Sequence, residues 1–354
     1  MSIPTEPIGS IPRPQELIDA TRAHAAGELS EEELERLQDE AVRDTILRFE
    51  ETGSPVITDG EQTKPSFATY PIHGMENLAP DGVVIPFADG HTRQLPRLTR
   101  GPFRYGTHAA SYLERAKGYA TRPVKQAVIS ASALSLLYPL DGIGGYSHDA
   151  FVGDLVKETE ADIRGALGGG AHKVQIDFTE GRLSIKLDPS KQLLRAFVDL
   201  NNQVLDRFSQ RERAKIGVHT CPGGDQDSTH SADVDYAELL PSLFDLKVGN
   251  FYVQLAGEAD RQRVLSIIKE LVRPGQRVFV GVIDPIEPRV ESREDVADRV
   301  LEAAEYLEPD QLGTCDDCGF SPFGDDTSTA RDTAFEKIRA RVEGTKLAAE
   351  KLGL

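Results

Sequence analysis

Residues 215–221 read Lys-Ile-Gly-Val-His-Thr-Cys, a short apolar run that ends in a histidine and a cysteine. A run of this length between polar residues predicts a buried β-strand. Together with the N-terminal segment near Ile8, such runs make eight candidate strands: Val56–Thr58, Val124–Ser130, Lys173–Phe178, Lys215–Thr220, Asn250–Ala256, Arg277–Ile283 and Gln311–Thr314. Stretches of helical period separate most of them: Glu31–Glu50, His148–Gly165, Lys191–Phe208, Tyr236–Leu246, Arg261–Val272, Arg293–Tyr306 and Thr327–Leu352. This alternation predicts a parallel sheet, and eight strands favour a closed (β/α)8 TIM barrel over an open sheet.

The segment from about residue 64 to residue 118 interrupts this alternation. It is rich in proline, glycine and aromatic residues, and residues 83–98 alternate as in a β-hairpin. We interpret residues 1–354 as one barrel, with this hairpin-containing segment inserted over one face. The segment is either a lid over a bound molecule or an excursion that packs against the rim.

The charge and the cysteine content limit the partners and the compartment. The net charge of −18 creates a field that repels nucleic acid and anionic membranes, so neither is expected as a partner. No apolar run reaches the roughly 18 residues of a membrane-spanning helix. The N-terminus lacks the basic and then apolar pattern of a signal peptide. Three clustered cysteines, an odd number, fit a reducing compartment better than a secreted disulfide scaffold, so we expect a cytoplasmic protein.

His219 and Cys221 lie at the carboxyl end of a candidate strand, where barrel active sites are found. Residues two apart in a strand point to the same side, so this imidazole and thiol can share one metal ion. Cys315 and Cys318 follow another candidate strand. A mixed nitrogen and sulfur set suits Zn²⁺. Two interpretations stay open: a catalytic site with an open coordination position, or a closed structural site that also uses Cys315.

Several motifs together resemble the catalytic barrel of cobalamin-independent methionine synthase, in the superfamily that includes uroporphyrinogen decarboxylase. The resemblance spans essentially the whole chain. It does not include the extra N-terminal barrel of the long enzymes. The motifs that carry it occur in the family's order: Ile8-Gly9-Ser10 with Pro12, Asp59-Gly60-Glu61, Gln175-Ile176-Asp177, His219-Thr220-Cys221, Asp284 with Pro288-Arg289-Val290, and Asp317-Cys318-Gly319.

The resemblance implies a zinc-dependent transfer of a methyl group to the thiol of homocysteine, which gives methionine. The implied zinc ligands are His219, Cys221 and Cys318. Zinc would keep the substrate thiol deprotonated, which makes it a nucleophile. The resemblance also implies that Glu61 and Asp177 bind the amino group of the amino acid. The Ser10 hydroxyl and nearby backbone amides would hold its carboxylate.

Two positions depart from the family pattern. Methionine synthases use a glutamate as a further zinc ligand where this chain has Gln254, although Glu258 lies four residues further on. The long enzymes carry a proton-transferring histidine where this chain has Ile286. Asp284, Glu287 or a water would then serve as the catalytic acid. His230, nine residues after Cys221, is a weak substitute for that histidine and is expected in an exposed loop.

These departures keep other functions open. Epoxyalkane:coenzyme M transferases resemble this chain in using a His-x-Cys motif with a distant cysteine and no glutamate, so the thiol is homocysteine or coenzyme M. Arg182 and Lys186 are candidates to bind a sulfonate, or else lie on a solvated face. The alkyl donor is a methyl-folate, a methyl-corrinoid or an epoxide. The alternative from another class is a non-catalytic protein with a structural Cys3His zinc.

Overall fold

Six parallel strands form the central sheet of the computed structural model, which describes residues 2–354. The strands are β5 (Gln126–Ile129), β6 (Val174–Asp177), β7 (Ile216–Thr220), β10 (Asn250–Val253), β11 (Arg277–Ile283) and β12 (Leu312–Asp316). Their order in the sheet, β12-β11-β10-β7-β6-β5, follows the chain. Each predicted strand in this part of the chain is therefore present, and each pairs with its neighbour in sequence.

Two extended segments near the N-terminus complete the ring of strands. Thr5 forms a parallel bridge to the edge strand β12, and Ile57 forms one beside the start of β5. The two segments also meet each other, because Ile11 N donates to Gly60 O at 3.0 Å. The sheet is thus closed at eight positions, and the predicted (β/α)8 barrel is confirmed.

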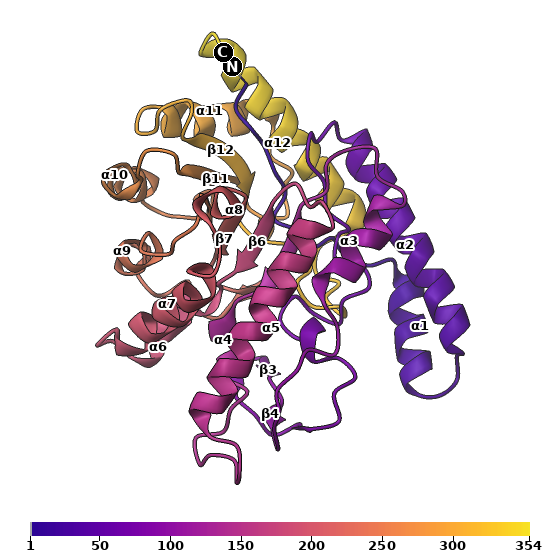
Figure 1. Ribbon diagram of the computed structural model, residues 1–354. Coiled ribbons are helices and arrows are strands. Elements are labelled where there is room, and N and C mark those ends of the chain that lie inside the picture. Colours follow the sequence, from indigo (N-terminus) through magenta and orange to yellow (C-terminus); the bar gives the residue numbers. More distant parts are fainter. Residues whose placement is uncertain (1) are drawn as a thin grey trace.

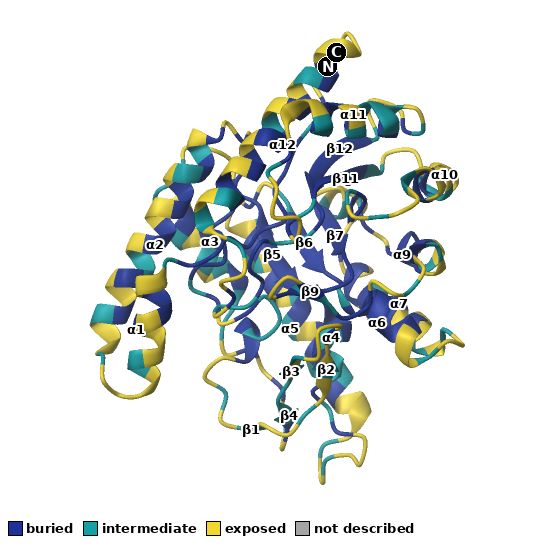
Figure 2. Ribbon diagram, turned by 180° about the vertical axis from the view of Figure 1, so that it is seen from behind, coloured by how far each residue is buried: buried dark blue, intermediate teal, exposed yellow. Residues whose placement is uncertain are grey.

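Helices cover the outside of the ring (Figure 1). They are α2 (Glu31–Glu51), α3 (Ala109–Lys117), α5 (His148–Gly168), α7 (Gln192–Leu205), α8 (Gln210–Arg213), α9 (Leu240–Leu243), α10 (Arg261–Leu271), α11 (Arg293–Ala304) and α12 (Arg331–Lys351). Figure 2 shows buried strands at the centre and exposed faces on the helices. The helix predicted over 236–246 is instead the 3-10 turn Tyr236–Glu238 followed by the single turn α9, with Pro241 in its first turn.

Five helices had no counterpart in the prediction: α3 and α8, named above, and α1 (Gln15–Ala25), α4 (Ala131–Ser135) and α6 (Glu180–Leu187). Each is short, and α6 directly follows β6, so too few residues show its period. No helix in the described part of the chain is long and apolar enough to cross a membrane.

The segment between Ile57 and β5 contains two short antiparallel ladders. Strand β1 (Leu78–Ala79) pairs with β4 (Arg97–Leu98), and β2 (Val84–Pro86) pairs with β3 (Thr92–Gln94). The hairpin β2–β3 contacts the loop after β7, because Arg93 binds the carboxylate of Asp225 there. The hairpin therefore lies over the carboxyl ends of the barrel strands.

Candidate active site

His219 presents one free ring nitrogen at the carboxyl end of β7. Its Nδ1 lies 3.3 Å from the backbone oxygen of Tyr252, and its Nε2 is buried without a hydrogen-bond partner. A carbonyl accepts only, so Nδ1 carries the proton and Nε2 offers its lone pair. Metal-binding histidines are commonly oriented by such a bond, so the unpartnered Nε2 fits a metal ligand.

Two thiols lie beside that nitrogen. Cys221 Sγ and Cys318 Sγ are 3.0 Å apart, and the ligand atoms of His219, Cys221 and Cys318 all lie within 4.8 Å of one another. The neighbouring Cys221 thiol and burial raise the pKa of Cys318 well above its usual value. Only a nearby positive charge would therefore make the Cys318 thiol a thiolate. The donor set fits Zn²⁺ and leaves one position of a tetrahedron free.

Cys315 does not belong to this group. It points into the barrel from β12, where its Sγ contacts the backbone oxygen of Phe279 at 3.3 Å. There it packs in a small buried cluster with Ile8, Tyr252 and Phe279. The closed Cys3His arrangement is therefore absent from the described residues.

Gln254 and Glu258 are both occupied by Arg182 from α6. Arg182 Nη1 lies 3.2 Å from Gln254 Oε1 and 2.8 Å from Glu258 Oε1. Its Nη2 donates to the backbone oxygens of Ala232 and Val234. The buried guanidinium thus has protein partners at both terminal nitrogens, which leaves few hydrogen-bond donors to bind a sulfonate. Glu258 is not part of the His/Cys/Cys group.

Lys186, the other residue considered for a sulfonate, is also paired. Its Nζ donates to His230 O and to Asp233, each at 3.0 Å.

The structure brings Ser10, Glu61 and Asp177 to one small cavity, which is also lined by His219 and Cys318. Asp177 and His219 are register partners in neighbouring strands, which explains how residues 42 positions apart meet. The three residues predicted to bind an amino acid thus adjoin the predicted metal ligands.

Glu61 lies in a tight turn after the second barrel position. Its φ of 56° is unusual for a residue other than glycine, and Asp59 Oδ1 supports the turn by accepting from Glu61 N at 2.9 Å. Its carboxylate is buried and pairs with Lys64 Nζ at 2.9 Å. Such backbone conformations are concentrated at functional sites, where the surrounding structure maintains them.

Asp177 is held by its neighbour in β6. Gln175 Nε2 donates to Asp177 Oδ1 at 2.7 Å. Burial raises the pKa of Asp177 to about 6; His219 acts against this rise and Glu61 adds to it. The carboxyl is therefore mainly ionised at neutral pH.

Ser10 lies against Gly319, the residue after Cys318. Its Oγ accepts from Ser321 N at 3.2 Å. A Cβ on Gly319 would come within 2.1 Å of Ser10 Oγ, so only glycine leaves the hydroxyl in place.

The two predicted acids lie in different surroundings. Asp284 lines a second small cavity together with Gln254 and Cys318, close to the metal group. Glu287 is exposed and accepts only from the backbone N of Arg289, at 3.2 Å. The structure therefore brings Asp284, but not Glu287, near the other site residues.

His230 is buried, so its predicted exposure is wrong. Its ring packs over Gly223 and against the edge of Phe87, 5.5 Å between ring centroids. Burial lowers its pKa to about 4, and the charges of Lys186 and Arg182 act in the same direction. The loop folds back onto the segment after Cys221, which the spacing alone did not show.

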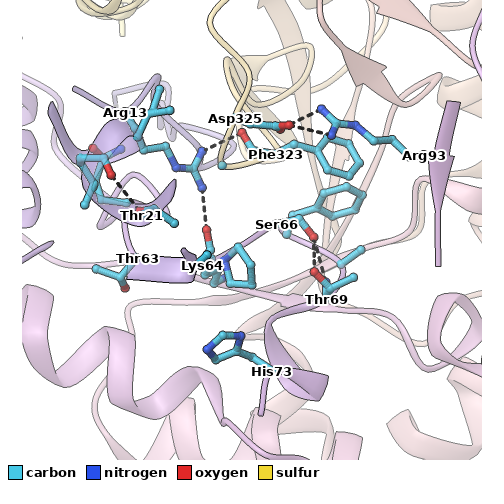
Figure 3. Close-up of a pocket in the computed structure, with 18 of the residues that line it drawn as sticks. Arg13, Thr21, Thr63, Lys64, Ser66, Thr69, His73, Arg93, Phe323 and Asp325 are labelled. Atoms are coloured by element: carbon cyan, nitrogen blue, oxygen red, sulfur yellow. Dashed lines mark hydrogen bonds and ion pairs between the residues drawn. The ribbon is translucent and has the colours of Figure 1, made fainter. Parts of the chain in front are cut away.

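A larger cavity of about 880 Å³ adjoins the small one, and Phe67, Thr179, Gly223 and Gly224 line both. Figure 3 shows Arg13, Lys64, Arg93, Phe323 and Asp325 around it. Arg93 pairs with Asp325 at 2.9 Å, and its guanidinium lies 4.2 Å from the Phe323 ring centroid. This cavity lies beside the loop that follows Cys221, under the hairpin β2–β3.

Comparison with known proteins identifies the family. The sequence profile "Cobalamin-independent synthase, Catalytic domain" matches residues 167–343, half of the chain, including all three predicted metal ligands. The chain belongs to this family. Family membership makes it a methyltransferase enzyme, as the curated relatives also indicate.

Curated relatives of the family match over the full length. "Methionine synthase" of Saccharolobus islandicus is 24% identical over 99% of this chain and 96% of its own. "Methionine synthase" of Sulfolobus acidocaldarius is 25% identical over 99% of this chain and 93% of its own.

Solved structures share the cobalamin-independent synthase fold. A B12-independent methionine synthase from Shewanella sp. W3-18-1, in complex with selenomethionine, has a TM-score of 0.77 at 18% identity and covers 99% of both chains. A putative vitamin-B12 independent methionine synthase from Listeria monocytogenes has a TM-score of 0.71 at 22% identity, with 98% of both chains covered.

Three residues that shape the site had no role assigned from the sequence, although Gln175 belongs to a quoted motif. Lys64 neutralises Glu61, Arg13 Nη2 donates to Glu61 O at 2.6 Å, and Gln175 orients Asp177. Gln175 carried a signal, because it lies two residues before Asp177 and so shares its face of the strand. Lys64 and Arg13 carried none, since a charged residue after a strand is usually solvated.

Proposed function

We propose that this enzyme transfers a methyl group to the thiol of homocysteine and depends on a zinc ion held by His219, Cys221 and Cys318. One observation carries the proposal. The cavity that contains the two buried carboxylates Glu61 and Asp177 is lined by His219 and Cys318 of the predicted metal group. An amino acid bound by its ammonium group there would present its side chain to the metal position.

Zinc, when bound, supplies the positive charge that keeps the substrate thiol deprotonated near neutral pH. The protein residues prepare that position. Tyr252 O holds the proton on His219 Nδ1, so that Nε2 is the ligand atom. Gly223 N lies 3.4 Å from Cys221 Sγ and donates to it, which stabilises negative charge on that sulfur.

Glu61 and Asp177 bind the substrate ammonium in this proposal. Lys64 neutralises one of the two carboxylates, so the pair carries about one net negative charge for the incoming cation. Ser10 donates its hydroxyl to the substrate carboxylate. A sulfonate thiol without an amino group would leave both buried carboxylates without a ligand partner.

The larger cavity accommodates the methyl donor. It meets the small cavity at Gly223 and Gly224, two and three residues after Cys221. Its wall combines the aromatic rings of Phe67, Phe87 and Phe323. A donor lying there would point its methyl group along the shared wall toward the sulfur.

Asp284 is the proposed acid for the leaving group of the donor. It lines the second small cavity, which Cys318 also lines. Its Oδ1 accepts from the backbone N of Ile286 at 3.0 Å. Asp284→Asn should lower kcat more than the affinity for homocysteine, because an amide cannot supply this proton. The exposed Glu287 offers a matched control, and Glu287→Gln should retain activity.

Calorimetry on zinc-loaded protein with homocysteine and with coenzyme M tests the proposed thiol. We expect homocysteine to bind at least about tenfold more tightly. Asp177→Asn should remove that preference, since it removes one of the two charges facing the ammonium. Equal binding of both thiols by the unaltered protein would contradict the proposal.

A further inference from the structure

Lys125 lies inside the barrel, below the cavity. It directly precedes β5 and is only 1% exposed. A buried ammonium is costly unless its hydrogens are taken up by partners. Lys125 Nζ donates to Gln175 Oε1 at 2.7 Å and lies 4.0 Å from the Tyr252 ring centroid. Burial lowers the pKa of Lys125 to about 8, and the Glu6 carboxylate opposes this, so the group is still an ammonium ion at neutral pH.

The contact with Lys125 determines which way the Gln175 amide faces. A lysine ammonium has three donors and no acceptor, so the amide atom beside it must be the oxygen. The nitrogen of the same amide then faces upward, where Nε2 donates to Asp177 Oδ1 at 2.7 Å. The usual ambiguity between the two amide orientations is thereby resolved by chemistry.

This orientation matters for Asp177. An amide nitrogen beside a carboxyl favours the ionised, acceptor form. An amide oxygen there would favour a protonated Asp177 that donates. Only the acceptor form attracts an ammonium ion. The three side chains thus form a chain of hydrogen bonds from the barrel interior to the cavity wall, where both Gln175 and Asp177 lie.

We infer that Lys125 is a positioning residue that sets substrate specificity. Through Gln175 it keeps Asp177 as the acceptor for the α-ammonium group of the thiol amino acid. The inference rests on the proposed function, because it assumes that Asp177 faces that ammonium.

The test compares ligands that differ only in the amino group. L-Homocysteine and 4-mercaptobutanoate share the thiol, the chain length and the carboxylate. The dissociation constants of both are measured by calorimetry on zinc-loaded protein. L-Methionine and 4-(methylthio)butanoate form a second pair without a free thiol.

The variant Lys125→Met keeps the length of the side chain and removes the donor, so the Gln175 amide is free to turn. The affinity for each amino acid should fall about tenfold, the loss expected for one hydrogen bond to a charged group. The affinity for each des-amino ligand should stay the same. Gln175→Leu removes the donor to Asp177 directly, should show the same change, and decides the question alone where Lys125→Met does not fold.

Lys173→Met is the matched control. Like Lys125, Lys173 directly precedes a barrel strand and is largely buried, but it pairs with Glu6 and lies over the Phe279 ring. This variant removes the same charge without touching Gln175, so the preference for amino ligands should persist. An equal loss in Lys173→Met would overturn the inference, because the effect would then be general electrostatics.

Separate outcomes test the role of Asp177 and the role of Lys125. If the unaltered protein does not prefer the amino ligands, the proposed role of Asp177 is wrong. If it prefers them and folded Lys125→Met keeps the full preference, the role of Lys125 is wrong and the proposed function stands. Where Lys125→Met does not fold, full preference in Gln175→Leu leads to the same conclusion.

Discussion

Cys221 Sγ and Cys318 Sγ lie 3.0 Å apart although 97 residues separate them in the chain. Each follows a different barrel strand, and β10 and β11 lie between those two strands in the sheet. The loops at the carboxyl ends must therefore fold inward to bring the two sulfurs together. Convergence of this kind is expected of a site and not of two unrelated thiols.

Removal of one of these thiols should strongly weaken metal binding. Cys318→Ala is expected to reduce bound zinc from about one equivalent per chain to less than about half, because two ligands remain. Elemental analysis of protein purified without chelator measures this.

Cys315→Ala is the control, since this thiol is buried away from the group. It should keep its zinc. Equal zinc in the two variants would contradict the ligand assignment.

A methyl group on Gly319 should weaken substrate binding. Its Cβ would lie 2.1 Å from Ser10 Oγ, so Gly319→Ala displaces the hydroxyl that we assign to the substrate carboxylate. The dissociation constant of homocysteine should rise about tenfold or more. Gly144→Ala serves for comparison, because a Cβ there meets nothing within 4 Å. Unchanged affinity in Gly319→Ala would exclude Ser10 from substrate binding.

Glu180 should make stability depend on pH. It accepts from the Ser130 and Ser132 hydroxyls, but its Oε2 is buried without a partner. Burial raises its pKa from 4.5 to about 7. Protonation therefore favours the folded state, whose stability falls as pH rises from about 5 to 7 and is then constant with respect to this group.

Glu180→Gln removes this titration and retains an acceptor for the two serines. Relative to the unaltered protein, its free energy of unfolding should rise by about 1–3 kcal/mol between pH 5 and pH 8. Urea denaturation at the two pH values measures the change. A difference between the proteins that is the same at both pH values would show that Glu180 is not protonated in the fold.

The sequence predicted the features that depend on local pattern. The strand that ends in His219 and Cys221 shows its apolar run, its length and its ligand spacing within seven residues. The barrel follows from repeated runs of this kind. Short elements such as α6 were not predicted, because eight residues contain barely two helical turns.

The contacts between distant charges could not be predicted. Nothing near Arg182 in the sequence shows that it is buried and bound to Gln254 and Glu258. Nothing near Lys125 shows that Gln175, 50 residues away, accepts a hydrogen bond from its ammonium group. Such pairings depend on which strands become neighbours, so they become visible only in the folded chain.

The number of sulfur atoms bound to zinc distinguishes an open catalytic site from a closed structural one. X-ray absorption at the zinc edge should find two sulfur ligands, from Cys221 and Cys318, in the protein alone. Addition of homocysteine should raise the count to three, since the substrate thiol takes the open position. Three sulfurs before addition, or an unchanged count after it, would contradict an open catalytic zinc site.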